Sequence, residues 1–215
     1  MNAKPGKKAN STSSGQLSSD ELTRHRIINT ARHHFFAFGF RAVTMDDIAA
    51  ELAMSKKTLY SHFRSKAELL QAAVLDKQQS IESDLERITS ESSSDFPAAI
   101  QQLLAKMQQH LGEIHPAFMR DIRREAPEIF ESVEVRRREL IHRYFTKILA
   151  QGRKAGVIRK DVPIRIIIEI WLGVVQAIMN PEKLTELDLT PEEGFSAIIS
   201  VMFKGLMTAE GRAKL

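Results

Sequence analysis

Apolar residues recur at helical spacing along almost the whole chain of 215 residues. From Ile28 to Phe38 they lie three or four positions apart. Gly39 then follows as a stop signal, so this stretch predicts a helix over residues 21–38. The same spacing predicts eight further helices, at residues 44–52, just after Ser55, and at residues 65–89, 98–112, 116–123, 126–152, 163–180 and 191–208. No segment alternates apolar and polar residues for long enough to indicate a strand, so the predicted fold class is all-α with about nine helices.

Hydroxyl and carboxylate side chains mark the starts of the first short helices. Thr44 and Asp47 have the spacing of a capping box, in which the hydroxyl satisfies orphan amides and the carboxylate lies at the third helical position. Ser55 is placed to cap the next helix. Ser65 and Glu68 form a stronger capping box, which opens the long helix that follows.

Composition divides the chain into three parts. Residues 1–20 contain too few apolar groups to offset the entropy of ordering, so we expect a disordered basic tail. The turn-rich stretch SESSSDFP, residues 90–97, is the clearest internal break. We therefore expect an N-terminal three-helix domain at residues 21–81, with a helix-turn-helix motif at about 44–63, and a helical C-terminal domain at residues 82–215.

The overall composition is that of a globular, water-soluble protein, with 43% apolar and 27% charged residues. The absence of cysteine excludes a disulfide scaffold, a thiolate metal site and a cysteine nucleophile. The longest apolar stretch, residues 166–179, contains Glu169 and Gln176 and is shorter than the roughly 20 residues needed to cross a bilayer. No hydrophobic run follows the first lysines, so we expect no secretory signal and a cytoplasmic location.

The positive charge is concentrated at the N-terminal end. The net charge is +4, but residues 1–75 contain 11 Lys or Arg against 6 Asp or Glu, whereas residues 76–215 contain 20 against 21. A basic segment joined to a neutral body indicates a polyanion partner for the first part and a different role for the second.

The second helix of the predicted helix-turn-helix has a polar, basic surface. Once Leu59 and Phe63 are assigned to the core, every remaining side chain can donate a hydrogen bond: Lys56, Lys57, Thr58, Tyr60, Ser61 and His62. No Asp or Glu occurs between Leu52 and Ala67, which is the local charge expected beside phosphates. The alternative is an ordinary solvated helix face, although such faces usually mix charges of both signs.

The sequence TMDDIAAELAMSKKTLYSHFRSKAELL closely resembles the N-terminal DNA-binding domain of the TetR family of bacterial transcriptional regulators. The resemblance extends over residues 21–81 and includes the aromatic-rich end of the first helix, FFAFGF. It rests on many positions together rather than on one motif: Thr44, Ile48, Ala49, Ser55, Thr58, Leu59, Tyr60, Phe63, Lys66 and Leu69.

The resemblance implies a dimer whose third helix enters the major groove while neighbouring helix starts contact the DNA backbone. Thr44, Tyr60, His62 and Lys66 are then phosphate contacts, and Lys56, Lys57 and Thr58 are candidates for base edges. Lys57 stands where the family more often has a small residue. The complete predicted DNA-binding set is Thr44, Ser55, Lys56, Lys57, Thr58, Tyr60, His62 and Lys66.

The predicted helix at residues 163–180 is apolar nearly all round, which indicates burial on more than one side. The simplest explanation is a core on one side and a second subunit on the other; the alternative is that its apolar stripes are all intramolecular core. A homodimer through this helix and the last one is also what the resemblance implies. The predicted interface residues are Ile168, Trp171, Val175, Phe195, Ile199, Met202 and Leu206.

The resemblance further implies a pocket for a small-molecule effector in the C-terminal domain. Apolar groups on helices that would surround it, and a cation beside them, are candidates for its lining, although such residues can equally be plain core. The predicted pocket residues are Phe118, Arg120, Phe130, Tyr144 and Trp171, with Met119 and Phe145 as further apolar groups.

Nothing in the sequence indicates an enzyme. The histidines lack the i, i+4 pairing with an intervening acid that a helical zinc hydrolase shows, and no GxSxG, P-loop or GxGxxG motif occurs. We expect no catalytic centre, no metal and no cofactor.

The leading hypothesis is thus a dimeric transcriptional regulator, most often a repressor in such families, which a small-molecule effector releases from a palindromic operator. One alternative is a constitutive DNA-binding or architectural protein whose C-terminal domain only dimerises or binds another protein. A weaker alternative is a helical protein that binds membrane surfaces through its basic tail and its apolar helix at 163–180.

Overall fold

The computed structural model describes residues 18–91 and 96–209, and within them the fold is all-α. An isolated antiparallel bridge pairs Ile158 with Met207. The elements are α1 (Ser19–Phe38), α2 (Met45–Glu51), α3 (Lys56–His62), α4 (Lys66–Glu91), α5 (Phe96–Gly112), α6 (Pro116–Glu125), α7 (Pro127–Leu140), the π-helical segment η1 (Ile141–Phe145), α8 (Thr146–Lys154), α9 (Ile164–Ile178), α10 (Pro181–Glu186) and α11 (Pro191–Leu206).

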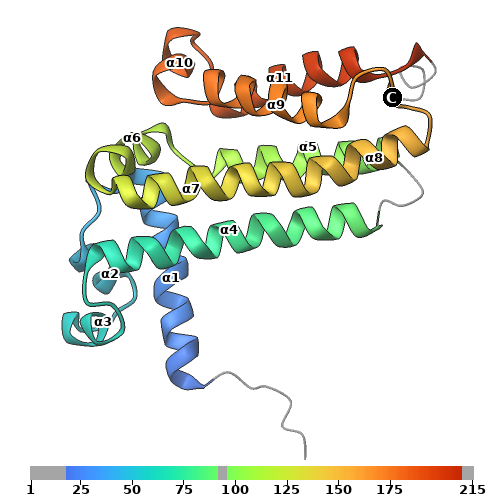
Figure 1. Ribbon diagram of the computed structural model, residues 1–215. Coiled ribbons are helices and arrows are strands. Elements are labelled where there is room, and N and C mark those ends of the chain that lie inside the picture. Colours follow the sequence, from blue (N-terminus) through green and yellow to red (C-terminus); the bar gives the residue numbers. More distant parts are fainter. Residues whose placement is uncertain (1–17, 92–95, 210–215) are drawn as a thin grey trace, which may run out of the picture.

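The helices are arranged around two hydrophobic cores. The smaller core joins α1, α2, α3, the first half of α4 and α6, which together we call the head. The larger core joins the second half of α4 with α5, α7, η1, α8, α9 and α11, which we call the body. In Figure 1, α4, the α7–α8 rod and the α9–α11 pair run as stacked layers, while α1 crosses α4 and α2 and α3 lie beside α1 at one end of the molecule.

The all-α prediction with about nine helices is confirmed, and the described ranges differ from the predicted elements in two places. The predicted helix at 126–152 contains a π-helical segment at Ile141–Phe145, which divides it into α7, η1 and α8. Helix α10 was missed because its six residues are too few to show a period. Asn180 caps it and Pro181 opens it, and these were the only start signals available.

The helix boundaries near the predicted tail and the predicted break also differ. Ser18 accepts a hydrogen bond from Glu21 and completes a capping box, so α1 begins at Ser19 rather than at residue 21. The remainder of the predicted disordered tail, residues 1–17, lies outside the described residues. Helix α4 ends at Glu91 and α5 begins at Phe96, so the predicted break narrows to residues 92–95, which also lie outside the described residues.

Helix α4 connects the two cores. Leu69 and Leu70, in its first turns, are fully buried in the head, whereas Leu85 and Ile88, four and five turns later, are buried in the body. A single unbroken helix therefore passes from one core to the other.

Helix α6 is the second connection, and sequence spacing did not assign it to the head. The Phe118 ring lies 4.5 Å from the Phe36 ring of α1, and the His115 amide donates to the Phe36 carbonyl at 2.8 Å. The Asp121 carboxylate accepts the Arg41 amide at 2.9 Å. The head core thus includes a helix that lies well beyond the predicted domain limit at residue 81.

Replacing Phe118 by alanine tests this connection. The side chain is 2% exposed, so its loss should lower the free energy of unfolding by about 3–5 kcal/mol, measured by urea denaturation. The matched control is Phe38→Ala, also an aromatic of the head but 59% exposed, which should change that free energy by no more than about 0.5 kcal/mol. Similar losses for the two variants would contradict the buried position of Phe118.

Candidate nucleic-acid interface

Helices α2 and α3 form a helix-turn-helix at the outer end of the head. Leu52 ends α2, and Ala53 turns the chain with a positive φ of 51°. The Met54 amide donates to the Ala49 carbonyl at 3.0 Å, which closes the turn. The Ser55 hydroxyl then accepts the Thr58 amide at 3.0 Å and caps α3. Local hydrogen bonds thus fix the angle at which α3 leaves α2.

The start of α2 is fixed by Thr44. Its hydroxyl accepts the Asp47 amide at 3.2 Å, and its own amide donates to the Asp47 carboxylate at 2.8 Å, so the predicted capping box is confirmed. Hydrogen bonds from Thr44 lower the pKa of Asp47. The Thr44 hydroxyl therefore has a structural partner in addition to its predicted role at a phosphate.

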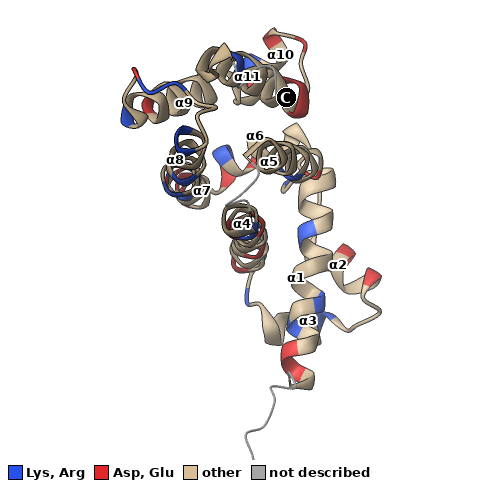
Figure 2. Cartoon of the chain, turned by 90° about the vertical axis from the view of Figure 1, so that its right-hand side faces the viewer, with Lys and Arg blue, Asp and Glu red and all other residues tan. Residues whose placement is uncertain are grey.

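Helix α3 buries one face and exposes the other. Leu59 and the following Phe63 have no exposed surface and hold the helix against the head core. The residues that point outward are Lys56, Lys57, Thr58, Tyr60 and Ser61. Figure 2 shows basic segments on α3 and acidic segments on α2 and at the start of α1. The exposed face of α3 itself has no acidic residue.

The two lysines of α3 differ in their surroundings. Lys56 donates to the Asp46 carboxylate at 2.5 Å, and this contact raises the pKa of Lys56. The Lys57 side chain makes no hydrogen bond or ion pair with any part of the chain that the structure describes. Lys57 is therefore available to bind another molecule, whereas Lys56 must first break its contact with Asp46.

Two predicted phosphate contacts are less accessible than the sequence indicated. The His62 side chain is 10% exposed and lies 3.8 Å from the Asp20 carboxylate of α1. The Lys66 ammonium lies 4.3 Å above the Phe40 ring, and partial burial lowers its pKa. Tyr60, by contrast, is 46% exposed. Of the predicted phosphate contacts that follow α2, Tyr60 faces outward most clearly.

One basic residue beside α3 was missed. Arg24 of α1 is exposed, and its guanidinium lies 4.8 Å from the Phe63 ring at the end of α3. It adds positive charge to the end of the motif from a distant part of the sequence. The available signal was weak, because a charged residue on the outer face of a helix usually only meets solvent.

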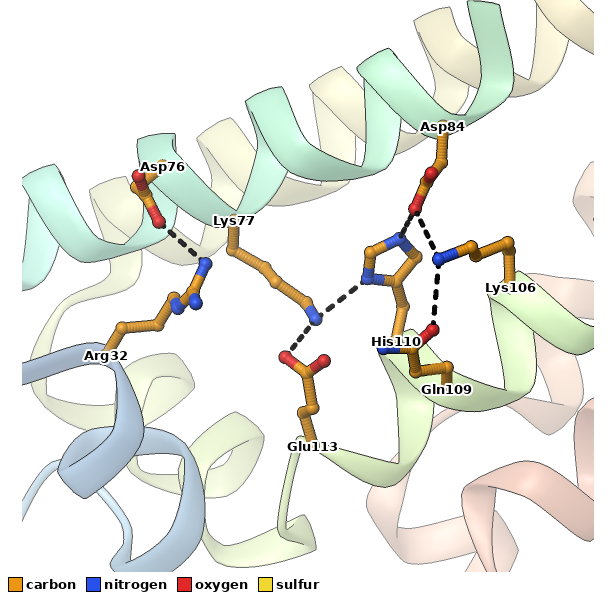
Figure 3. A network of polar contacts seen from close by, with 8 residues as sticks. All are labelled: Arg32, Asp76, Lys77, Asp84, Lys106, Gln109, His110 and Glu113. Atoms are coloured by element: carbon orange, nitrogen blue, oxygen red, sulfur yellow. Dashed lines mark hydrogen bonds and ion pairs between the residues drawn. The ribbon is translucent and has the colours of Figure 1, made fainter. Parts of the chain in front are cut away.

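A polar network links the head to the body along α4 (Figure 3). Arg32 of α1 donates to Asp76 at 2.7 Å. The next residue, Lys77, is 4% exposed and donates to His110 Nδ1 at 2.9 Å and to Glu113 at 2.5 Å. Burial lowers the pKa of Lys77.

His110 is the member of this network that reaches the interior of the body. Burial, and then the positive charge of Lys77, lower the pKa of His110 and keep the ring neutral. Because its Nδ1 accepts from Lys77, its Nε2 carries the proton and donates to Asp84 at 3.1 Å. Both ring nitrogens therefore have partners from α4.

The body contains a partly open cavity of about 250 Å³. The polar side chains that line it come from α4, α5 and α7 and are Gln78, His110, Glu134, Arg136 and Arg137. Helices α9, α10 and α11 contribute mainly apolar lining, including Trp171, Val175, Leu184 and Phe195. The cavity thus has a polar side and an apolar side.

The predicted pocket residues do not gather around this cavity, apart from Trp171, Met119 and Phe145. Helix α6 turns Phe118 towards α1, and Phe130 packs on the same head core. Tyr144 is buried between the body helices beside Lys147, and Arg120 is exposed. Helical spacing marks apolar residues but does not say which of two cores each one enters, and this is the reason for the difference.

The predicted dimer residues lie in the protomer's own core. Six of them are no more than 9% exposed, and Met202 packs against the same cluster: Ile168, Trp171, Val175, Phe195, Ile199 and Leu206. These side chains are turned inward, so the predicted interface needs correction. The outward apolar residues of the same helices are Ile166, Ile170 and Ala177 of α9 and Ala197 and Val201 of α11, with Gly173 and Gly205 beside them.

Two other possibilities concern metal ions and membranes. In residues 18–91 and 96–209, no group of three or more His, Cys, Asp or Glu side chains is placed to hold a metal ion. Within the same ranges, no helix combines the length and the apolar character needed to span a membrane.

The head matches a known family of domains. The model of the bacterial regulatory proteins of the tetR family matches residues 27–73. The transcriptional regulator UidR of Escherichia coli K12 is 46% identical over 57 residues, which are 26% of this chain and 29% of UidR. The matched segment therefore spans less than a third of that relative.

Other relatives are similar over most of the chain. The uncharacterized transcriptional regulator YvaF of Bacillus subtilis is 23% identical over 176 residues, which cover 78% of this chain and 87% of YvaF. A TetR-family regulator from Agrobacterium tumefaciens has a TM-score of 0.67 at 17% identity, over 88% of this chain and 100% of that one. The reduced form of NemR from E. coli has a TM-score of 0.62 at 16% identity, over 87% and 98% of the two chains. The head is thus similar to the DNA-binding domain of TetR-family regulators, and the chain as a whole shares its all-α fold with a solved TetR-family regulator.

Proposed function

We propose that this protein is a transcriptional regulator that binds a palindromic DNA operator as a homodimer and is released from it by a small-molecule effector. Repression is the outcome that fits release by an effector. The protein then acts where the operator DNA is, in the cytoplasm. Its similarity to a family of regulators agrees with the prediction that it is not an enzyme.

The observation that carries the proposal is the outer face of α3. It is exposed, it lacks acidic residues, and it is held at a fixed angle by the capped turn that precedes it. A helix presented in this way fits the major groove, where lysine donates to guanine and threonine contacts thymine. Lys57 and Thr58, in the first turn of α3, are best placed for base edges, and Tyr60 for a phosphate.

A homodimer is supported by the outer faces of α9 and α11. Ile170 is 48% exposed and Val201 is 72% exposed, although both lie on helices whose other faces are core. A Cβ at Gly173 or Gly205 would meet nothing within 4 Å in the protomer, so packing within the chain does not require glycine there. Close approach of a second copy explains both the apolar residues and the glycines.

Release by an effector is supported by the cavity, whose wall includes α4 and α6, the two connections to the head. A constitutive DNA-binding or architectural protein would need a body for dimerisation only, and an apolar cavity inside it would lower its stability without benefit. The cavity is thus the observation that favours a ligand-responsive regulator over this alternative.

Selection of bound sites from a random duplex library tests the proposal, with the affinity of the selected site followed across salt concentration. We expect a palindrome with half-sites about one helical turn or more apart, bound at least about a thousandfold more tightly than random DNA. No enrichment, with binding that only weakens as salt rises, would indicate a DNA-coating protein and overturn the operator.

Replacing Lys57 by alanine tests the base contact. We expect at least about a tenfold loss of affinity for the selected operator and a relaxed preference at one or two base pairs, because a lysine donor to a base edge is lost. Fluorescence anisotropy with operator variants measures both effects. The control is Lys160→Ala, which removes the same charge from an exposed position on the body. If the two variants lost the same affinity for the operator, the loss would be a general effect of charge, and the base contact of Lys57 would be contradicted.

Replacing Ile170 by glutamate tests the corrected dimer face. The buried carboxylates of two copies would face each other, so we expect monomers in analytical ultracentrifugation and a loss of operator binding of more than about tenfold. The control is Val135→Glu on α7, where the aliphatic side chain is 52% exposed and thus similar to Ile170. A dimer that persists in Ile170→Glu but dissociates in Val135→Glu would place the interface elsewhere.

A further inference from the structure

We propose that the effector of this protein is a small, largely apolar molecule, not a cation, that presents an oxygen acceptor to Gln78 and Arg137. The inference rests on the proposed function, because it names the chemistry of the ligand that the regulator would sense. It concerns one end of the cavity in the body and the side chains that line that end.

The size of the cavity limits the ligand. Its volume of about 250 Å³ lies just below the roughly 300–1,000 Å³ of pockets that hold drug-sized molecules. A compact molecule with a single ring or a short chain therefore fits better than a large polycyclic compound.

The two sides of the cavity favour a ligand with one apolar part and one polar part. Trp171, Val175 and Phe195 are buried residues on the α9–α11 side, where the lining is apolar apart from the indole N–H of Trp171. A ligand gains free energy there by burying hydrocarbon or a ring. On the opposite side, α4 and α7 present polar groups, so the ligand must place its polar atom there.

Gln78 supplies the first polar requirement. Its Nε2 is buried and has no hydrogen-bond partner in the chain. An orphaned buried donor costs free energy until an acceptor meets it. Gln78 lines both the cavity and the outer groove between α4 and α7, so its side chain belongs to the wall where the two adjoin.

Arg137 is a second hydrogen-bond donor in the cavity wall. Its Nη2 donates to Glu134, and among the described residues no other acceptor meets the guanidinium. A guanidinium has five donors and no acceptor, so an oxygen of the ligand is the partner that suits it.

The remaining polar groups of the cavity wall do not favour binding of a cation. Glu134 is paired with Arg137, and both nitrogens of His110 have partners on α4. The guanidinium of Arg136, which also lines the cavity, is paired with Glu82 and Glu139 of the outer groove. A cationic ligand would thus meet Arg137 without an unpaired carboxylate to balance it.

A matched series of probes tests the proposal in the full-length protein. Butyrophenone, phenylbutyrate, phenylbutylamine and butylbenzene share a phenyl ring and a four-carbon chain, and they differ in carrying a carbonyl, a carboxylate, an ammonium or no polar group. Trp171 is the only tryptophan of the chain and lines the cavity, so its fluorescence reports entry of a probe without any DNA. Calorimetry supplies the affinities.

We expect butyrophenone or phenylbutyrate to bind about tenfold more tightly than butylbenzene, and phenylbutylamine to bind more weakly than all three. The tighter of the two oxygen probes identifies the acceptor as a neutral carbonyl or as a carboxylate. Gln78→Met keeps the side-chain length and removes the donor, so it should reduce the preference for the oxygen probe over butylbenzene by about tenfold. Gln79→Met is the control, because Gln79 is exposed and lines only the outer groove.

Three results would overturn the proposal. Phenylbutylamine could bind most tightly, butylbenzene could bind as tightly as the oxygen probes, or none of the four could change Trp171 fluorescence up to its solubility limit. Operator binding, measured in the same preparation, separates this failure from a failure of the proposed function. Protein that binds its operator but no probe would remain a regulator with a different effector or with none.

Discussion

The structure depends on the burial of a single helix in two separate cores. Helix α4 places Leu70 in the head and Ile88 in the body, so one unbroken helix contributes buried side chains to both cores. The α4 segment between these two cores carries Lys77, which could not be buried without His110 and Glu113 as partners. The position of the head relative to the body is thus set by apolar burial at both ends and by charge pairing between them.

Helix α6 makes the same connection by a second route. Phe118 belongs to the head core, while its neighbour Met119 lines the cavity. Interiors are close-packed, so a ligand that displaces Met119 must also move the backbone that holds Phe118 against Phe36. Helix α4 also lines the cavity, at Ile81 and Leu85. Both helices that connect the body to the head therefore form part of the wall of the same cavity. The proposed effector would therefore change the head position without touching the helix-turn-helix.

Much of the fold could be predicted from the sequence, because helical periodicity and capping residues are local signals. Thr44 and Ser55 cap their helices as the sequence indicated. What the sequence could not show was which core an apolar residue enters, as with Phe118, because periodicity gives a face and not its partner. The partly covered positions of His62 and Lys66 depend on contacts with α1 and with the segment that follows it, and no local pattern encodes those contacts.

Helices α9 and α11 explain why the predicted interface was placed on the wrong residues. A helix that is apolar all round has two stripes, and the sequence does not say which one faces inward. Trp171 and Phe195 occupy the inner stripes and line the cavity, while Ile170 and Val201 occupy the outer ones. If the outer stripes hold two protomers together, the same two helices carry the wall of the cavity on one face and the subunit contact on the other. Their positions would then couple the cavities of the two protomers and fix the distance between the two copies of α3, on which the half-site spacing depends.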